Sequence, residues 1–256
     1  MSSPPESAAS NARLPIPNRT RAGVWVWRLG VVVWIVALFT PDARAEDRVT
    51  FRSEDGHTVA GVLVEASQRP APAVILVGML GRPKEDWLPT AERLAAANIT
   101  SLAIDLRSQY LPDDAKSAAG WHADIVAAVG YLVGRPDVRP WAIGVAGASL
   151  GASLAAVAAA TDPRIRSLAL VSPSLDYRGI RIEGALKQYA ERPALLIASL
   201  RDPYAARSAR ELAADAAGRR ELQWTETAGH GTVLLAREPD LVRSLVEWFQ
   251  RTLGVN

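Results

Sequence analysis

One serine in this sequence lies in a pattern that suits a catalytic nucleophile. Ser149 is the central residue of Gly147-Ala148-Ser149-Leu150-Gly151, which matches Gly-x-Ser-x-Gly. An apolar run precedes the pattern at residues 141–146, and an alanine-rich run follows it at residues 152–160. A strand, a sharp turn and a helix in this order expose the serine hydroxyl, and the glycines let the strand and helix approach closely. We predict that Ser149 is a nucleophile and that the Leu150 amide, at the helix start, binds an oxyanion.

Such a serine needs a base, and the sequence offers one histidine in a suitable place. The base is oriented by a carboxylate, and after a serine in this strand-turn-helix context the partners follow in the order acid, then histidine. Of the three histidines in the chain, only His230 follows Ser149, and glycines flank it on both sides. We predict that His230 is the base and assign no role to His57 or His122.

The acid should follow a strand that ends at the same edge of the sheet as Ser149. Asp202 follows an apolar run at residues 194–200, with only Arg201 between them, and meets this condition. Because Pro203 suits the first position of a helix, Asp202 is also a good helix N-cap, and one aspartate can serve both purposes. We predict that Asp202 orients the base. The other aspartates after Ser149 fall in a helix end, a loop, a helix or beyond His230: Asp162, Asp176, Asp215 and Asp240.

A second amide donor for the oxyanion should come from the loop after the third predicted strand. That loop is Gly78-Met79-Leu80-Gly81, which follows the apolar run at residues 73–77. We predict that the Met79 amide is the donor, with the Leu80 amide as the alternative. This chemistry needs neither a metal nor a cofactor. The chain has no cysteine and no phosphate-binding loop, and the glycines around Ser149 do not form Gly-x-Gly-x-x-Gly.

The elements that must position these residues alternate along the chain. Predicted helices alternate with short apolar runs, a pattern typical of a doubly wound, mostly parallel sheet with helices on both faces. We predict an α/β fold with about eight strands in a single domain, residues 46–256. Only 22 residues, 172–193, separate two of the strands, so no large cap fits there. The predicted strands are 48–52, 58–65, 73–77, 99–104, 141–146, 165–171, 194–200 and 222–225, and the predicted helices include 84–97, 118–133, 152–160 and 241–253.

The first 45 residues have the features of a secretory signal peptide. They begin with a polar segment that contains arginines, and an uninterrupted apolar run of 11 residues follows at 29–39. That run is too short to span a bilayer unaided, and Ala43-Arg44-Ala45 provides a small-x-small cleavage pattern before Glu46. We predict an exported protein, periplasmic or secreted. The alternative is an uncleaved N-terminal segment that anchors the chain to a membrane.

The charge of the chain gives no indication of a nucleic-acid partner. The whole sequence carries a formal net charge of +2, but residues 1–45 contain five arginines and two acidic residues. The remaining part has 24 basic and 25 acidic residues, so the excess of positive charge belongs to the predicted signal peptide. No basic patch is evident in the sequence. We therefore expect a small-molecule substrate, with neither nucleic acid nor membrane as a partner of the mature domain.

Together these features resemble the α/β-hydrolase superfamily, and within it the small bacterial members without a large lid that are related to dienelactone hydrolase and simple esterases. The resemblance covers about residues 48–253 and implies that Ser149, Asp202 and His230 form a catalytic triad. It also implies a serine hydrolase that cleaves a small carboxylic ester or lactone through an acyl-enzyme on Ser149. The segments that carry it are residues 74–81, 84–87, 103–107, 147–151, 201–203 and 229–231.

Two segments depart from the pattern of many relatives. Where those proteins have His-Gly at the start of the oxyanion loop, this chain has Val77-Gly78 or Gly78-Met79. Where they have Asp-x-Arg-Gly-His-Gly, this chain has residues 105–110 with the sequence Asp-Leu-Arg-Ser-Gln-Tyr. The first departure supports one alternative function, a catalytically silent protein of the same fold that acts in binding or in the cell envelope.

Overall fold

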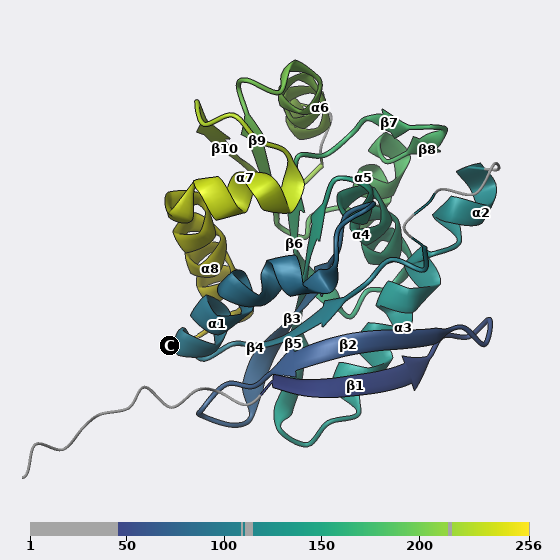
Figure 1. The fold of residues 1–256 in the computed structure, drawn as a ribbon, viewed down its shortest axis with the longest axis vertical. Helices are drawn as coiled ribbons and strands as arrows, with labels where there is room; N and C mark the ends of the chain where they lie inside the picture. Colours follow the sequence, from purple (N-terminus) through teal and green to yellow (C-terminus); the bar gives the residue numbers. More distant parts are fainter. Residues whose placement is uncertain (1–45, 109, 111–114, 215–216, 256) are drawn as a thin grey trace, which may run out of the picture. The chain divides into compact units, whose positions relative to one another are not determined.

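Eight strands form one twisted sheet in the computed structural model, which describes residues 46–108, 110, 115–214 and 217–255 (Figure 1). The strand order is β1-β2-β4-β3-β5-β6-β9-β10. β2 runs antiparallel to both of its neighbours, and all the other neighbouring strands are parallel. The predicted mostly parallel sheet of about eight strands is therefore confirmed. The strands are β1 (Glu46–Arg52), β2 (Thr58–Val64), β3 (Ala71–Val77), β4 (Thr100–Ile104), β5 (Val138–Ala148), β6 (Ile165–Val171), β9 (Ala194–Ser199) and β10 (Arg220–Thr225).

Helices cover both faces of this sheet because the strand side chains alternate between two apolar layers (Figure 1). In β3, Ile75 packs in the layer that α3, α4, α5 and α6 cover, whereas Leu76 packs in the layer beneath α1, α7 and α8. The helices are η1 (Lys84–Trp87), α1 (Leu88–Ala96), α2 (Ala115–Ala119), α3 (His122–Val133), α4 (Leu150–Thr161), α5 (Glu183–Tyr189), α6 (Pro203–Ala214), α7 (Gly231–Arg237) and α8 (Pro239–Leu253).

Two predicted helices are divided in the structure. The helix expected over residues 84–97 begins as the 3-10 turn η1 and continues as α1, because Pro89 has no amide proton and is tolerated only in a first helical turn. The helix expected over residues 118–133 is α2 and α3, separated at Gly120 and Trp121.

The segment between β6 and β9 contains no large cap, as predicted. It forms a small hairpin, β7 (Asp176–Tyr177) with β8 (Ile180–Arg181), and then α5, which packs on α4. The Tyr204 hydroxyl at the start of α6 donates a hydrogen bond to the Asp176 carbonyl (2.8 Å), so the hairpin is fastened beside the loop that contains Asp202.

Two side chains that follow β4 fix neighbouring loops. Asp105 accepts hydrogen bonds from the Lys84 backbone amide and from Lys84 Nζ, both at 2.7 Å, and so anchors η1. Arg107 donates to Asp124 on α3 (2.8 Å from Nε) and to Asp55 in the β1–β2 turn. Hydrogen bonds from Arg107 and Ser53 hold the pKa of the Asp55 carboxyl well below its usual range.

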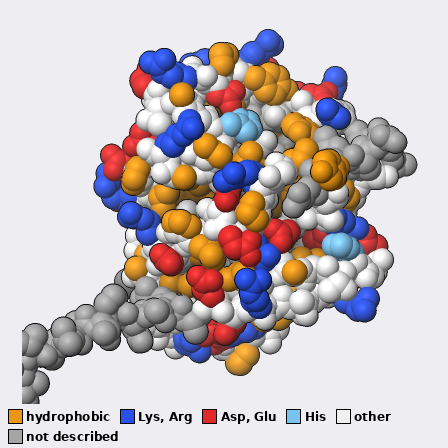
Figure 2. Space-filling model, in the orientation of Figure 1, with side chains coloured by type: hydrophobic (Ala, Val, Ile, Leu, Met, Phe, Trp, Pro, Cys, Tyr) orange, Lys and Arg blue, Asp and Glu red, His pale blue; other side chains and the backbone are white. Residues whose placement is uncertain are grey.

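The face of the molecule in Figure 2 carries acidic and basic side chains that are mixed with one another and with hydrophobic ones. In the part of the chain that the structure describes, no helix has both the length and the apolar character needed to cross a bilayer. The predicted signal peptide, residues 1–45, lies outside the described residues and stays a prediction, as does the export of the protein.

Candidate active site

Ser149 occupies a strained turn between β5 and α4. Its backbone has φ 54° and ψ −118°, a positive φ that is rare for a residue other than glycine. The Ser149 amide donates a hydrogen bond to the Val171 carbonyl at the end of β6 (2.9 Å), which fixes the turn to the neighbouring strand. The side chain is therefore held at the carboxyl edge of the sheet, as the Gly-x-Ser-x-Gly pattern predicts.

The two glycines of the pattern are required by backbone packing. A Cβ atom at Gly147 would overlap the carbonyl group of Gly151, and one at Gly151 would overlap the carbonyl oxygen of Gly78. The second contact shows that the start of α4 lies directly against the loop after β3. The glycines thus bring together the serine turn and the loop predicted to bind an oxyanion.

The structure brings Ser149, His230 and Asp202 together in one hydrogen-bonded chain. His230 Nδ1 lies 2.6 Å from Asp202 Oδ2, and His230 Nε2 lies 2.8 Å from Ser149 Oγ. With Nδ1 protonated, the imidazole donates to the carboxylate and accepts the proton of the serine hydroxyl. The three residues come from the loops that follow β5, β9 and β10, so parallel strands carry them to one edge.

Asp202 makes both of the contacts expected of it. Its Oδ1 accepts a hydrogen bond from the Ala205 amide in the first turn of α6 (3.1 Å), while Oδ2 is bound to His230. The cap uses one carboxylate oxygen and fixes the direction of the other. The helix start therefore orients the carboxylate that orients the imidazole.

The predicted oxyanion donors lie on adjoining segments. Leu150 is the first residue of α4, and Met79 begins a turn that the Arg82 amide closes on the Met79 carbonyl (3.2 Å) with Gly81 at φ 71°. Neither the Met79 amide nor the Leu150 amide donates a hydrogen bond to any residue that the structure describes. Met79 lines the pocket beside His230, whereas the Leu80 side chain packs on the core. The Leu80 amide likewise donates to no described residue, so the choice of Met79 over Leu80 stays a prediction.

Comparison with known proteins finds distant relatives of this chain. No protein-family model matches the chain. It is similar to a thiohydrolase of Arthrinium phaeospermum, with 29% identity over 150 residues, and to a polyketide transferase of Stachybotrys chlorohalonatus, with 31% identity over 138 residues. These matches cover 57% and 50% of this chain and 48% and 45% of the relatives, so the chain spans about half the length of the curated relatives it matches.

A solved structure decides the fold. The dienelactone hydrolase of Anabaena variabilis superposes on 82% of this chain and 99% of its own with a TM-score of 0.70, at 21% identity. This chain has the α/β-hydrolase fold. The predicted resemblance in fold is confirmed, and the loops that contain Ser149, Asp202 and His230 follow β5, β9 and β10 of this fold.

Sequence reasoning missed a residue that supports the histidine within this α/β-hydrolase fold. Ser172 directly follows β6, is fully buried and has φ 50°. Its hydroxyl oxygen accepts a hydrogen bond from the Gly231 amide (2.9 Å), and its own amide donates to the Ile197 carbonyl (2.7 Å). Ser172 therefore joins the end of β6 to the residue after His230. Its position immediately after the apolar run at residues 165–171 is the sequence signal that could have indicated it.

We expect Ser172→Ala to destabilise the protein by about 1–3 kcal/mol, because the substitution leaves the buried Gly231 amide without an acceptor. Urea unfolding at pH 7 measures this change. A matched control is Ser153→Ala, which removes a buried hydroxyl that has no hydrogen-bond partner among the described residues. The control should leave the free energy of unfolding unchanged or raise it. Equal losses in the two variants would contradict a specific role for the Ser172 hydrogen bond.

Two pockets lie beside the loop after β3, and Met79 lines both of them. One, of about 460 Å³, opens beside His230 and is lined by Met79, Arg201, Asp202, Pro203, Gly229, Val233 and Arg237 as well. The other, of about 240 Å³, lies between the 79–83 loop and residues 105–108. The side chain of His230 is 41% exposed, whereas Ser149 is 7% exposed.

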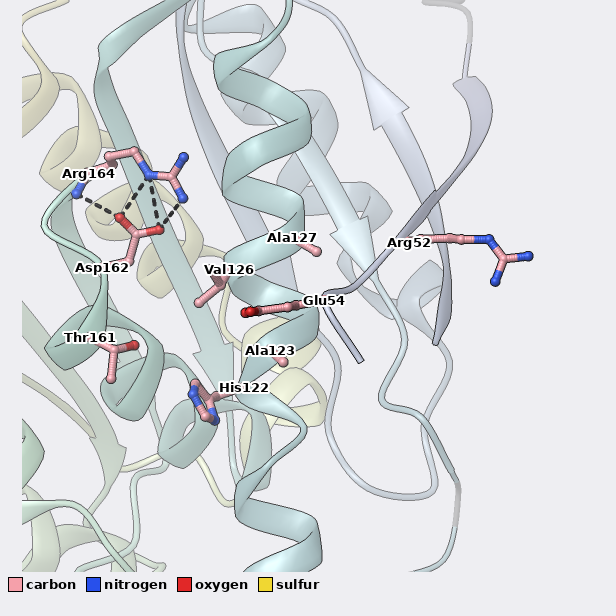
Figure 3. A pocket seen from close by; sticks show the side chains of 9 residues that line it. All are labelled: Arg52, Glu54, His122, Ala123, Val126, Ala127, Thr161, Asp162 and Arg164. Atoms are coloured by element: carbon pink, nitrogen blue, oxygen red, sulfur yellow. Dashed lines mark hydrogen bonds and ion pairs between the residues drawn. The ribbon is translucent and has the colours of Figure 1, made fainter. Parts of the chain in front are cut away.

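A separate pocket of about 480 Å³ lies away from Ser149, between α3, the end of α4 and the β1–β2 turn (Figure 3). It contains His122 and Asp162, neither of which was predicted to be catalytic. Asp162 is paired with Arg164 (Figure 3), and His122 Nδ1 lies 2.8 Å from the Ala119 carbonyl. His57 lies 3.9 Å from Asp124. Within the described residues, no three His, Asp or Glu side chains are grouped so that they could hold a metal ion.

Proposed function

We propose that this chain is a serine hydrolase that cleaves a small carboxylic ester or lactone through an acyl-enzyme on Ser149. The observation that carries the proposal is the continuous hydrogen-bonded chain from Asp202 through His230 to Ser149 Oγ, with links of 2.6 and 2.8 Å. A hydroxyl bound to a neutral imidazole nitrogen can lose its proton as it attacks.

Acylation would begin with attack of Ser149 Oγ on the acyl carbon while His230 Nε2 takes the serine proton. The negative charge that develops on the carbonyl oxygen would be stabilised by the amides of Leu150 and Met79. Neither amide donates a hydrogen bond to a residue that the structure describes. Collapse of the tetrahedral species breaks the bond to the alcohol oxygen. The imidazolium then gives its proton to that oxygen, and the alcohol leaves or, in a lactone, stays attached at the far end of the acyl chain.

Deacylation would repeat these steps with water. His230 removes a proton from water, the hydroxide oxygen bonds to the acyl carbon, and the bond to Ser149 Oγ breaks as the serine regains a proton. Asp202 stays ionised throughout and stabilises the imidazolium that forms in each half-reaction. These residues supply every proton transfer that the reaction needs.

The open site favours small or soluble substrates over long acyl chains. The connection between β6 and β9 is a short hairpin and one helix, and the pocket beside His230 is open at the surface. The similar thiohydrolase and polyketide transferase suggest that a thioester should also be offered to the protein. The same residues could attack a thioester carbonyl, so the substrate panel must compare esters with thioesters.

We expect the full chain to react covalently with a fluorophosphonate probe, because phosphonylation requires an activated serine. Ser149→Ala should not react. Mass spectrometry of the labelled peptide locates the adduct, and panels of esters, lactones, thioesters and peptides then rank the substrates by kcat/KM.

The folded state of both proteins is checked by circular dichroism, which guards against loss of labelling through misfolding. If a folded wild-type protein does not react, the hydrolase proposal fails, and the catalytically silent binding protein becomes the better description. If Ser149→Ala reacts as fast as the wild type, Ser149 is not the nucleophile.

A further inference from the structure

One carboxylate connects the oxyanion loop to the segment that contains the base. Asp86 lies in η1, and its Oδ2 accepts a hydrogen bond from Thr232 Oγ1 (3.0 Å) and another from Arg82 Nε (2.6 Å). Thr232 is two residues after His230, and Arg82 closes the turn that begins at Met79. We propose that Asp86 is a positioning residue that holds the Met79 amide and the His230 imidazole at a fixed separation. This inference rests on the hydrolase function proposed above.

The surroundings of Asp86 make this contact more than a surface ion pair. The Asp86 side chain is only 18% exposed and Thr232 is 3% exposed, so their hydrogen bond is shielded from water. Thr232 Oγ1 also lies 3.3 Å from Met79 Sδ. Its single proton goes to the carboxylate, which is the stronger acceptor, and the sulfur packs against the same hydroxyl.

The backbone at Gly231 confirms that the two loops are in direct contact. Gly231 has φ 57°, and a Cβ atom there would lie 2.6 Å from Met79 Sδ. The segment after the base is thus shaped to admit the Met79 side chain. A shift of the oxyanion loop would move Met79 against this segment and disturb the base at the same time.

The remaining anchors do not fix this separation. Asp105 holds Lys84 and thereby fixes η1 to the end of β4. Ser172 holds Gly231 to the end of β6. Each of these contacts ties one loop to the sheet, whereas Asp86 ties the two loops to each other. Since transition-state stabilisation depends on the distance between the oxyanion donors and the base, the Asp86 contact should act on catalysis rather than on substrate binding.

Two near-isosteric substitutions test this role: Asp86→Asn, which removes the charge, and Thr232→Val, which removes the hydroxyl. We expect each to lower the second-order rate of fluorophosphonate labelling by roughly 10- to 100-fold, because the donors move from their positions relative to the attacked centre. With a reactive ester, kcat should fall while KM changes little. The affinity for a trifluoromethyl ketone, which forms a tetrahedral adduct, should fall in parallel with kcat.

Two controls separate positioning from a general structural effect. Glu85→Gln removes the neighbouring carboxylate of η1, which interacts with Lys84 and Arg48 but not with Thr232, and should label at the wild-type rate. Thr232→Ser keeps the hydroxyl and should restore labelling relative to Thr232→Val. Because Asp86 and Thr232 act through one contact, the double variant should be little worse than the poorer single variant.

The outcomes distinguish this inference from the function on which it rests. If the wild type does not label, both fail. If the wild type labels and both folded single variants, Asp86→Asn and Thr232→Val, label at the wild-type rate, the hydrolase proposal stands and the positioning role of Asp86 is wrong. Additive losses in the double variant, or an equal loss in Glu85→Gln, would also overturn it. Should Asp86→Asn fail to fold, Thr232→Val and Thr232→Ser still give the decision.

Discussion

His230→Ala should lower kcat on an ester substrate by roughly 10⁴- to 10⁶-fold, because Ser149 then has no group to take its proton. Asp202→Asn should lower kcat on the same substrate by about 10⁴-fold. The amide can donate to Nδ1 as well as accept from it, so it no longer selects the tautomer that leaves Nε2 free to accept the serine proton. Pre-steady-state and steady-state rates on the best ester from the panel give both numbers.

The combination of these substitutions is as informative as the single changes. Groups that act as a unit are not additive, so the double variant His230→Ala/Asp202→Asn should be about as active as His230→Ala alone. His122→Ala is a matched control, because that histidine lies in the separate pocket of Figure 3 and should leave kcat unchanged. A double variant much slower than His230→Ala would show that Asp202 acts by a route that does not pass through the imidazole.

Gly151→Ala should destabilise the fold by about 4 kcal/mol or more, at the severe end of single substitutions. The added methyl group would overlap the Gly78 carbonyl oxygen and approach the Val77 carbonyl oxygen, at 2.8 Å. Both obstacles are backbone atoms of β3 and the loop after it, and they cannot move aside as a flexible side chain can. Urea unfolding measures the loss, and fluorophosphonate labelling should disappear with it.

Gly130→Ala provides the control for this prediction. Gly130 lies within α3, and a Cβ atom there meets no other atom within 4 Å. Alanine has the higher helix propensity, so this variant should gain about 0.5–1 kcal/mol of stability. If Gly151→Ala were as stable as Gly130→Ala, the close packing of α4 on the loop after β3 would be wrong.

The parts of the site that could be predicted from sequence are those with a local signature. The flanking glycines indicate Ser149, the order of residues along the chain indicates His230, and a place after an apolar run indicates Asp202. Central strands such as β3 and β9 were predictable because a strand that is buried on both faces requires a continuous apolar run. The same reasoning missed the division of the 118–133 helix, since the helical spacing of its apolar residues does not report the break near Gly120.

The supporting residues could not be predicted because their roles depend on contacts between distant segments. Asp86 and Thr232 are 146 positions apart, and Ser172 and Gly231 are 59 apart. Nothing near Asp86 in the sequence distinguishes it from Glu85 beside it. The loop after β3 and the loop after β10 meet over the end of β5. Only this contact shows that Asp86, and not Glu85, reaches Thr232.

The turn of the β7–β8 hairpin is a site where the chain could accept inserted residues. Its turn residues, Arg178 and Gly179, are exposed and have φ values of 49° and 89°, while its base is fastened to α6 by the Tyr204 hydroxyl. Because the tip is exposed, additional residues could be inserted there without displacing β6, β9 or the buried core. In the proposed hydrolase, a longer turn at this tip should therefore leave the hydrogen-bonded chain of Asp202, His230 and Ser149 unchanged.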